Sequence, residues 1–317
     1  MRVLVADRFS DDARATLAAD GFAVAYTPDA RGDALTAVIA DTQADVLVVR
    51  STRVDADMLR SGRLKLVIRA GAGFNTIDVA TARSMGIYVA NCPGKNSNAV
   101  VEIAFGLIIA LDRQIAANVA DLQRGAWRKA AYSSARGLAG STLGLVGVGR
   151  IGRAMIPRAK AFDMSVAGWS RSLTDETADE LGIARKTTPA DVAQSADIVS
   201  VHVSLNDDTR QMVGRDFFAA MREGAIFINT SRAEVVDEAA LAWAVRERGI
   251  KAGLDVFEGE PPSGTGSIDN PLFALDGVIG THHIGGQTSE AQRAIADETV
   301  RIIREYHATG TPPNLVT

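Results

Sequence analysis

Short apolar runs alternate along the chain with stretches in which apolar residues recur every three or four positions. Four runs near the beginning are rich in Val, Leu and Ile and predict strands buried on both faces: 3–6, 46–49, 66–69 and 87–90. The amphipathic stretches 10–19 and 30–40 predict helices between them. Buried strands separated by helices are typical of a parallel sheet that helices cover on both sides.

A second series of the same kind follows a long predicted helix at 99–114 and a polar stretch that ends at Gly140. Its apolar runs predict six strands: 142–146, 165–168, 198–203, 225–229, 253–256 and 278–281. Helical patterns lie between and after them: 150–162, 189–195, 215–220, 238–248 and 289–307. Six strands with intervening helices predict a complete doubly wound α/β unit.

Composition narrows the class of protein. The 317 residues are enough for about two domains, and 23% charged with 47% hydrophobic residues is ordinary for a globular protein. The net charge of −4 comes without a basic stripe, so we expect no nucleic-acid partner. A lone cysteine, Cys92, is expected to be packed and fits a reducing cytoplasm. No signal peptide or apolar run long enough to span a bilayer is visible, so we expect a cytoplasmic protein that is not bound to a membrane.

A glycine pattern, Gly-X-Gly-X-X-Gly, follows the predicted strand 142–146 and opens the next predicted helix. Gly147 permits a tight turn, Gly149 lets the backbone approach a pyrophosphate, and Gly152 lets the helix pack closely on the sheet. Exposed N–H groups and the dipole at the helix N-terminus favour phosphate oxygens. In this context the turn predicts a bound nicotinamide dinucleotide; the alternative is a glycine-rich turn without a ligand.

The type of dinucleotide depends on the end of the second strand. An acidic residue is expected there, about 20 residues after the glycines, to hold the adenosine ribose hydroxyls. Ser170 and Arg171 stand in its place. Because an arginine attracts the 2′-phosphate that a carboxylate would repel, we expect NADP to be preferred over NAD. The alternative is that Arg171 is a solvated surface residue and that NAD is bound less selectively.

Further segments make a resemblance specific. In this order, they resemble the D-isomer-specific 2-hydroxyacid dehydrogenase family: Val-Val-Arg-Ser-Thr at 48–52, the segments 69–78 and 96–102, the glycine turn, the segments 228–238 and 253–261, and His-Ile-Gly-Gly at 283–286. The resemblance covers nearly the whole chain. It implies an NAD(P)-dependent oxidoreductase with a Rossmann-type dinucleotide domain and a smaller flavodoxin-like α/β substrate domain.

The resemblance implies three catalytic residues, Arg232, Glu260 and His283. Reducing a 2-keto acid requires a proton for the carbonyl oxygen as hydride reaches its carbon, and histidine is the side chain that titrates near neutral pH. A carboxylate bonded to the other ring nitrogen fixes the tautomer and favours the imidazolium. An arginine can bind the substrate carboxylate by two bonds and polarise the carbonyl.

Neighbouring residues compete for two of these roles. His282 stands where the family usually has proline, and the Ile-Gly-Gly that follows selects His283 by resemblance. Glu258 also precedes the proline segment, but the glutamate immediately before the proline is Glu260. His202 ends a predicted buried strand and is either packed in the core or lines the cofactor. The His and Cys spacings predict no metal site.

Other contacts carry over from the same resemblance. The substrate carboxylate would meet Arg50, Ser51 and the backbone N–H groups of Ala72 and Gly73. Besides Gly147, Gly149, Gly152, Ser170 and Arg171, the implied cofactor contacts are Arg150, Ile151, Val203, Thr230, Ser231, Arg232, Asp255, His283 and Gly285. The Asp255 carboxylate would face the nicotinamide amide, or alternatively accept N–H groups of its own loop.

The resemblance also implies how the chain is divided. Residues about 1–98 and 286–317 would form the substrate domain, and residues about 99–285 the dinucleotide domain, with the site in the cleft between them. The segment 115–140, which carries Trp127 and Tyr132, corresponds to the family's dimerisation arm, so a homodimer is expected. The alternative for this segment is simple packing within its own chain.

The function expected from these features is an NADP-linked reductase of a small 2-keto acid such as glyoxylate or hydroxypyruvate. Within the same class, 3-phosphoglycerate dehydrogenase is the alternative, because Val-Arg-Ser-Thr-Arg resembles that enzyme's substrate loop and Arg53 or Lys95 would be available to a phosphate. A dinucleotide-sensing protein of the corepressor kind is the alternative from another class. The Arg–Glu–His set argues against it, although corepressors can retain the set.

Overall fold

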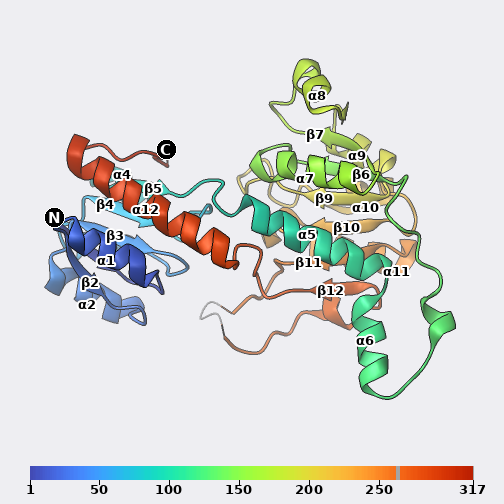
Figure 1. The fold of residues 1–317 in the computed structure, drawn as a ribbon, viewed down its shortest axis with the longest axis horizontal. Coiled ribbons are helices and arrows are strands. Elements are labelled where there is room, and N and C mark those ends of the chain that lie inside the picture. Colours follow the sequence, from blue (N-terminus) through green and yellow to red (C-terminus); the bar gives the residue numbers. More distant parts are fainter. Residues whose placement is uncertain (262–264, 317) are drawn as a thin grey trace. The chain divides into compact units, whose positions relative to one another are not determined.

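The structure is a computed structural model that describes residues 1–261 and 265–316. Contacts within the described chain divide it into two compact units. Unit 1 contains residues Met1–Asn96 and Gln287–Thr317, and unit 2 contains residues Ser97–Gly286. Figure 1 shows the elements of each unit along the chain.

The described residues of unit 1 form a five-stranded parallel sheet in the order β2-β1-β3-β4-β5. Its strands are β1 (Arg2–Val5), β2 (Ala23–Tyr26), β3 (Val46–Val49), β4 (Leu66–Arg69) and β5 (Tyr88–Asn91). Its helices are α1 (Asp11–Ala19), α2 (Gly32–Thr42), α3 (Ala56–Arg60), α4 (Val79–Ser84) and α12 (Ser289–Thr309). This strand order confirms the expected flavodoxin-like arrangement.

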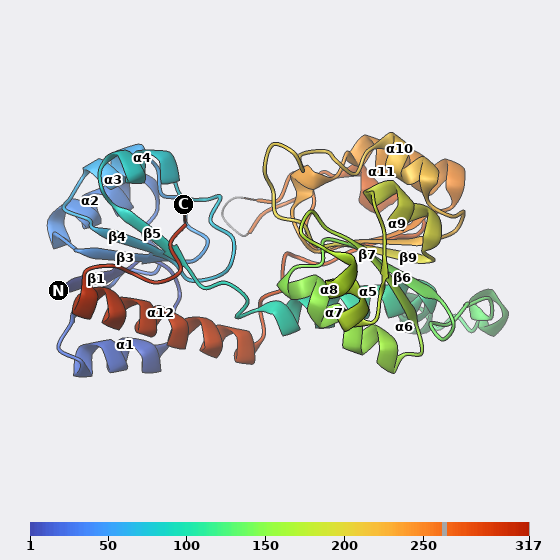
Figure 2. The same cartoon turned by 90° about the horizontal axis from the view of Figure 1, so that it is seen from above.

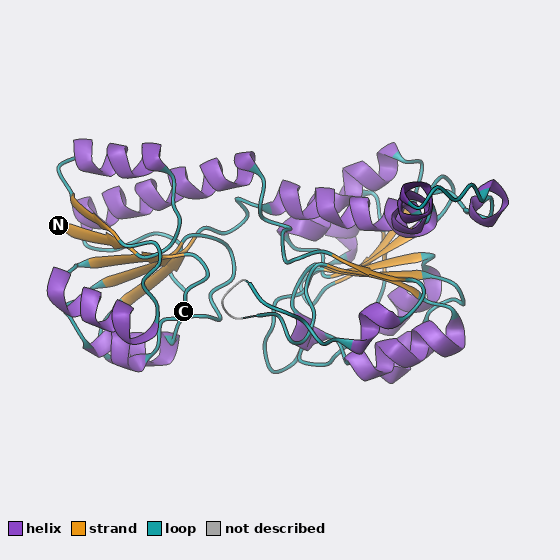
Figure 3. Ribbon diagram, turned by 90° about the horizontal axis from the view of Figure 1, so that it is seen from below, coloured by secondary structure: helices purple, strands orange, loops and turns teal. Residues whose placement is uncertain are grey.

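Strand β3 shows why its sequence is apolar at every position. Val46 and Val48 face a core that is shared with α1 and α12, whereas Leu47 and Val49 face a second core shared with α2, α3 and α4. Successive side chains of a strand point to opposite faces, so a strand in the middle of a covered sheet buries all of them. Figure 3 shows the helices on both faces, and Figure 2 shows α1 alongside α12.

Unit 2 contains, in its described residues, a seven-stranded parallel sheet in the order β12-β11-β10-β9-β6-β7-β8. Its strands are β6 (Thr142–Val146), β7 (Ser165–Trp169), β8 (Ala184–Arg185), β9 (Ile198–Val201), β10 (Ile226–Asn229), β11 (Lys251–Leu254) and β12 (Val278–Gly280). Its helices are α5 (Ser97–Asp112), α6 (Ile115–Gln123), α7 (Arg150–Ala161), α8 (Asp175–Leu181), α9 (Pro189–Ser195), α10 (Arg215–Ala220) and α11 (Glu238–Arg248). The described residues also form the short 3₁₀ helices η1 (Lys129–Tyr132), η2 (Ala233–Val235) and η3 (Pro271–Ala274).

This order is that of a doubly wound dinucleotide-binding sheet with one strand added at the β12 edge. The chain winds from β6 to β7 on one side and crosses back to β9 on the other. The carboxyl ends of β6 and β9 therefore flank the switch point, where ligands of such sheets bind. None of the helices in the described part of the chain is both long enough and apolar enough to cross a membrane.

The structure differs from the sequence prediction at the sheet edges. The pattern predicts six strands in unit 2 and misses β8, because both of its residues are exposed and no apolar run marks them. It also misses β2, an edge strand that is only partly buried. The run 198–203 is predicted too long, since the strand ends at Val201 and the following residues enter the loop at the carboxyl edge. The run 253–256 is displaced, since β11 begins at Lys251.

Candidate active site

The glycine turn joins β6 to α7 at the switch point. Gly147 has a φ of +104°, and a Cβ there would lie 2.7 Å from the carbonyl carbon of His202. A Cβ on Gly152 would lie 2.2 Å from the carbonyl oxygen of Gly147. A Cβ on Gly149 would instead meet no described heavy atom within 4 Å, and the described residues provide no side-chain cap for α7. The open space and the uncapped N–H groups fit a pyrophosphate.

Other residues expected at the cofactor lie along the same edge of the sheet. Arg150 and Ile151 begin α7, and the rest follow the carboxyl ends of β9, β10 and β11: Val203, Thr230, Ser231 and Asp255. Two side-chain atoms there, Nδ1 of His202 and Oγ1 of Thr230, are buried without a hydrogen-bond partner among the described residues. Buried polar atoms are rarely left unpaired, so this edge fits a polar ligand.

His202 follows β9 at the same edge of the sheet, and its Nδ1 is buried. Its Nε2 lies 2.9 Å from the Ser200 hydroxyl, and burial lowers its pKa to about 4. The ring is therefore neutral at physiological pH and is not suited to donate the proton of a reduction. A packed or cofactor-lining role remains for it.

Ser170 and Arg171 follow β7 directly. The Arg171 guanidinium lies 3.1 Å from the Asp208 carboxylate, and both side chains are exposed. Without a ligand, Arg171 thus forms a surface ion pair, which corresponds to the solvated alternative. Such exposed pairs contribute little free energy, so a phosphate could compete for the guanidinium.

Glu260 and His283 are brought together by two different loops of unit 2. Oε2 of Glu260 lies 2.7 Å from Nδ1 of His283, and Oε1 accepts a hydrogen bond from the Phe257 N–H at 3.2 Å. Because a carboxylate only accepts hydrogen bonds, Nδ1 of His283 carries the hydrogen of this bond. Nε2 is then the ring nitrogen that does not bond to Glu260. His283 adopts a φ of +51°, which is uncommon for a residue with a side chain and points to a constrained loop.

Asp255 supplies that constraint. Its buried Oδ1 accepts hydrogen bonds from the Thr281 hydroxyl at 2.6 Å and the Ile284 N–H at 2.8 Å. Its Oδ2 accepts the Gly285 N–H at 2.8 Å, and a Cβ on Gly285 would lie 2.8 Å from that oxygen. The carboxylate therefore fixes both sides of His283. Of the two roles expected for Asp255, the contacts correspond to acceptance of N–H groups, although the donors belong to the loop after β12 and not to the loop of Asp255 itself.

Arg232 lies at the end of the loop that follows β10. Asn229 accepts the Ser231 N–H at 3.0 Å and the Ser231 hydroxyl at 2.7 Å, and its amide nitrogen donates to the Arg232 carbonyl at 2.9 Å. Burial lowers the pKa of Arg232, and the negative charges of Glu234 and Glu260 oppose this. Arg232 is thus a largely desolvated cation near Glu260. The sequence motifs do not single out Asn229, although a polar residue that ends a buried strand is an available signal.

The two competing residues, His282 and Glu258, are not the ones that the 2.7 Å contact joins. His282 is exposed, and the exposed Glu258 contributes its N–H to Oε1 of Glu238 at 2.6 Å. Burial raises the pKa of Glu238, whose other oxygen accepts the Asn270 amide at 2.8 Å. Glu238 therefore supports the loop that leads to Glu260, a role that its sequence pattern does not indicate. The geometry favours Glu260 and His283 as the acid–base pair.

Unit 1 holds the residues expected to bind a substrate carboxylate. Arg50 and Ser51 follow β3, and Ala72 and Gly73 follow β4. The Arg50 guanidinium donates to the side chain of Gln287. Burial lowers the pKa of Arg50, and the negative charge of Asp7 opposes this.

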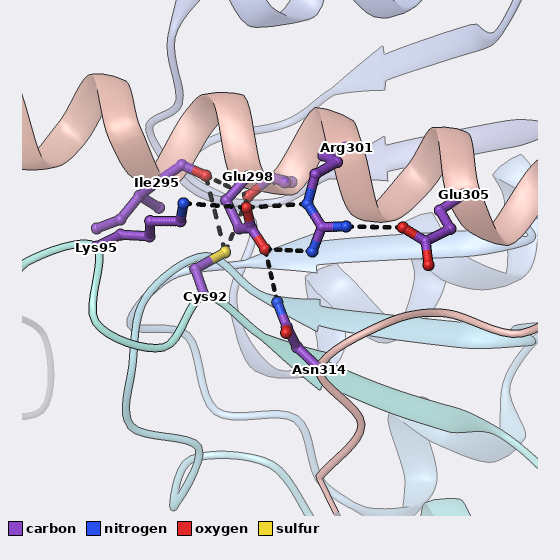
Figure 4. A network of polar contacts seen from close by, with 8 residues as sticks. Cys92, Lys95, Ile295, Glu298, Arg301, Glu305 and Asn314 are labelled. Atoms are coloured by element: carbon purple, nitrogen blue, oxygen red, sulfur yellow. Dashed lines mark hydrogen bonds and ion pairs between the residues drawn. The ribbon is translucent and has the colours of Figure 1, made fainter. Parts of the chain in front are cut away.

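Lys95, one of the two residues considered for a phosphate, is already engaged within unit 1. Its Nζ lies 3.2 Å from Oε2 of the buried Glu298, which also bonds Arg301 and the Asn314 amide. Figure 4 shows this network beside Cys92, whose buried thiol lies 3.5 Å from the Thr299 hydroxyl. The engagement of Lys95 weakens its predicted phosphate role; the other residue, Arg53, is exposed.

The Glu298 network makes a prediction about stability and pH. Hydrogen bonds from Arg301 above all, and from Asn314 and Lys95, lower the pKa of Glu298 from 4.5 to about 2. A lowered pKa contributes stability above the unfolded value and loses it as the pH falls towards the folded value. Glu298→Gln should therefore lower the free energy of unfolding at pH 7, with a smaller difference at pH 3. Chemical denaturation at both pH values measures this; an equal difference at both would contradict it.

Within the described residues, no group of three His, Cys, Asp or Glu side chains could hold a metal ion. Cys92 lies in the core of unit 1, and burial raises the pKa of its thiol. Burial keeps this group protonated, in agreement with the packed role expected from the sequence.

Comparison with known proteins places the geometry in context. Residues 105–285 match the family model described as D-isomer specific 2-hydroxyacid dehydrogenase, NAD binding domain. The chain is 38% identical over 311 residues to a D-3-phosphoglycerate dehydrogenase of Methanocaldococcus jannaschii, an alignment that covers 96% of this chain but only 58% of that relative. It is 41% identical over 265 residues to a hydroxypyruvate reductase of Thermotoga maritima, covering 82% of this chain and 84% of the relative. A solved acyclic imino acid reductase in complex with NADPH and D-Arg has a TM-score of 0.85 at 26% identity and covers both chains fully.

Proposed function

Because the chain belongs to the D-isomer specific 2-hydroxyacid dehydrogenase family, we propose that it exchanges hydride between a nicotinamide dinucleotide and a small 2-keto or 2-hydroxy acid. The observation that carries this proposal is the 2.7 Å contact between Glu260 and His283, with Arg232 nearby, in the unit that also carries the glycine turn. A proton donor, its carboxylate and a cation for the substrate are the groups that such a reduction needs.

The residues divide the reaction between them. When bound, the dinucleotide supplies the hydride for reduction or accepts it in oxidation. In reduction, Nε2 of His283 gives its proton to the carbonyl oxygen of the substrate, and Glu260 stabilises the imidazolium before this transfer. Arg232 binds the substrate carboxylate and polarises the carbonyl. The keto acid thus gains one hydride at carbon and one proton at oxygen and becomes the 2-hydroxy acid.

The two units take different roles in this proposal. Unit 2 is the dinucleotide domain, because the glycine turn and the uncapped start of α7 belong to it. Unit 1 is the substrate domain, in which Arg50, Ser51 and the N–H groups of Ala72 and Gly73 bind the carboxylate. These are the roles that the resemblance implies for the same residues.

We propose glyoxylate or hydroxypyruvate as the substrate, and 3-phosphoglycerate as the alternative. The similarity to a hydroxypyruvate reductase and the engagement of Lys95 with Glu298 favour the first. The similarity to a D-3-phosphoglycerate dehydrogenase and the exposed Arg53 favour the second. A panel of 2-keto acids and 3-phosphoglycerate, each assayed with both cofactors, tests the proposal. Cofactor binding without turnover of any of them would support a dinucleotide sensor instead.

We propose NADP as the preferred cofactor, with Arg171 as its 2′-phosphate contact. Arg171→Ala should raise the KM for NADPH about tenfold and change the KM for NADH by less than about twofold, since only NADPH carries the phosphate. Asp208→Ala, which releases Arg171 from its ion pair, should lower the KM for NADPH. A wild-type enzyme that strongly prefers NADH would contradict the proposed cofactor.

We also propose a homodimer that forms through residues 115–140. Figure 1 shows α6 and the segment after it extending away from the sheet of unit 2, and Figure 2 shows that segment projecting from the unit. Val119 and Leu122 on α6 are 47% and 55% exposed, and Trp127 is 80% exposed. An apolar surface of this kind is typical of an interaction site. Light scattering should give about twice the monomer mass, and a purely monomeric protein would contradict the proposal.

A further inference from the structure

Asp7 is a buried carboxylate to which the proposed reaction gives no role. It follows β1 closely, and only 4% of the residue is exposed. Its Oδ2 accepts the N–H groups of three consecutive residues: Arg50 at 2.6 Å, Ser51 at 3.1 Å and Thr52 at 3.1 Å. Its Oδ1 accepts a hydrogen bond from Arg31 at 2.9 Å. One side chain thus holds the first three residues of the loop that follows β3.

The position of Asp7 in the sheet explains why the loop depends on it. Strands β1 and β3 are neighbours, and their carboxyl ends flank the point where the chain changes winding direction in unit 1. The sheet contacts of β3 end when Val49 accepts the Ala70 N–H at 2.7 Å. Beyond this point the N–H groups of residues 50–52 bond to the Asp7 carboxylate instead of a neighbouring strand. Hydrogen bonds to a charged acceptor are among the stronger hydrogen bonds in proteins.

We propose that Asp7 is a positioning residue for substrate binding, which fixes the backbone of residues 50–52 so that Arg50 and Ser51 present their side chains to the substrate carboxylate. This inference rests on the proposed function, in which those two side chains bind the substrate. Asp7 acts through the loop and does not touch the substrate itself. The side chain of Gln287 accepts a hydrogen bond from the Arg50 guanidinium. Arg50 is therefore held at its backbone by Asp7 and at its guanidinium by Gln287.

The negative charge of Asp7 has a second effect on the same loop. Arg50 is half-buried, and burial lowers the pKa of its guanidinium, whereas the charge of Asp7 raises it. Asp7 therefore supports a cation that is partly removed from water before any substrate arrives. A substrate carboxylate would meet a guanidinium that is already desolvated and oriented, which lowers the entropy that binding must overcome.

The chain offers a matched control at the amino-terminal ends of the strands of the same sheet. Asp45 precedes β3, is 9% exposed, accepts the Arg2 N–H at 2.8 Å and pairs with Arg63 at 3.1 Å. It is therefore, like Asp7, a buried carboxylate with a backbone donor and an arginine partner. It differs in facing the amino ends of the strands, away from the loop of residues 50–52.

The test compares Asp7→Asn and Asp7→Ala with Asp45→Asn and Arg50→Met. In the Asp7 variants we expect the KM for the keto acid to rise about tenfold, with kcat changed less and the KM for the cofactor within about twofold. Asp45→Asn should lower the melting temperature comparably and leave the KM for the keto acid near the wild-type value. If Arg50→Met raises that KM but folded Asp7→Asn does not, the positioning role is wrong and the proposed substrate contact stands. If Arg50→Met leaves it unchanged, the proposed contact itself fails.

A second measurement does not depend on turnover. Amide hydrogen exchange at residues 50–52 should be faster in Asp7→Asn than in the wild type, because the asparagine amide cannot satisfy both the loop and Arg31. Asp45→Asn should leave exchange at these three amides unchanged. Unchanged protection in Asp7→Asn would overturn the inference, whichever substrate the protein uses.

Discussion

His283→Ala is expected to lower kcat by about 10²- to 10⁴-fold, because the variant has no side chain to give a proton to the carbonyl oxygen. The contact that predicts this is the 2.7 Å approach of Nδ1 to Glu260, which fixes the tautomer and leaves Nε2 for the substrate. Binding of the dinucleotide should change much less, since the glycine turn is untouched. Steady-state kinetics together with a fluorescence titration of the cofactor separate the two effects.

His282→Ala is the matched control for this prediction. His282 is the preceding residue and is exposed, so its loss removes a histidine from the same loop without removing the ring that faces Glu260. We expect kcat within about threefold of the wild type for this control. If His283→Ala kept near-normal turnover, or if His282→Ala lost as much, the assigned proton donor would be wrong.

Arg232→Met is expected to lower kcat/KM by about 10³-fold or more, because it removes both bonds to the substrate carboxylate and the charge that polarises the carbonyl. The Arg232 cation is pre-positioned, since Asn229 holds its loop and burial has already removed much of its water. Arg232→Lys should recover only part of the loss, because an ammonium keeps the charge but not the planar pair of donors. Kinetics over a range of keto-acid concentrations measure both variants.

Arg248→Met separates a catalytic effect from a loss of folding. Arg248 is also half-buried in unit 2 and donates to the Met221 carbonyl at 2.7 Å, away from the Glu260–His283 pair. We expect it to lower the melting temperature with little change in kcat/KM. An effect of Arg232→Met no larger than that of Arg248→Met would mean that Arg232 does not bind the substrate.

The sequence predicted the parts of the fold that are encoded locally. Val46–Val49 is apolar at every position because both faces of β3 are buried, and such runs can be recognised without a structure. The exposed Ala184–Arg185 strand carries no such signal, because its place at the edge of the sheet is decided by its pairing with β7. Edge strands depend more on tertiary context than on their own residues.

The candidate site likewise has one part that the sequence predicts and another that only the tertiary structure shows. The spacing of Gly147, Gly149 and Gly152 encodes a turn within six residues, so the sequence alone predicts where a dinucleotide would bind. Glu260 and His283 are 23 residues apart, and only their loops bring Nδ1 within 2.7 Å of the carboxylate. In the sequence, only the family resemblance distinguishes Glu260 and His283 from the neighbouring candidates Glu258 and His282.

The sequence by itself determined the class of fold, the glycine turn and the set of residues from which a site could be built, since periodicity and short motifs are local properties of the chain. Only the tertiary structure decided what each buried charge does: that Asp255 holds the loop of His283, that Lys95 is engaged with Glu298, and that Asp7 holds residues 50–52. The reason is physical. A buried carboxylate must find donors wherever the fold places them, and these partners lie 29, 203 and 43 positions away in the chain.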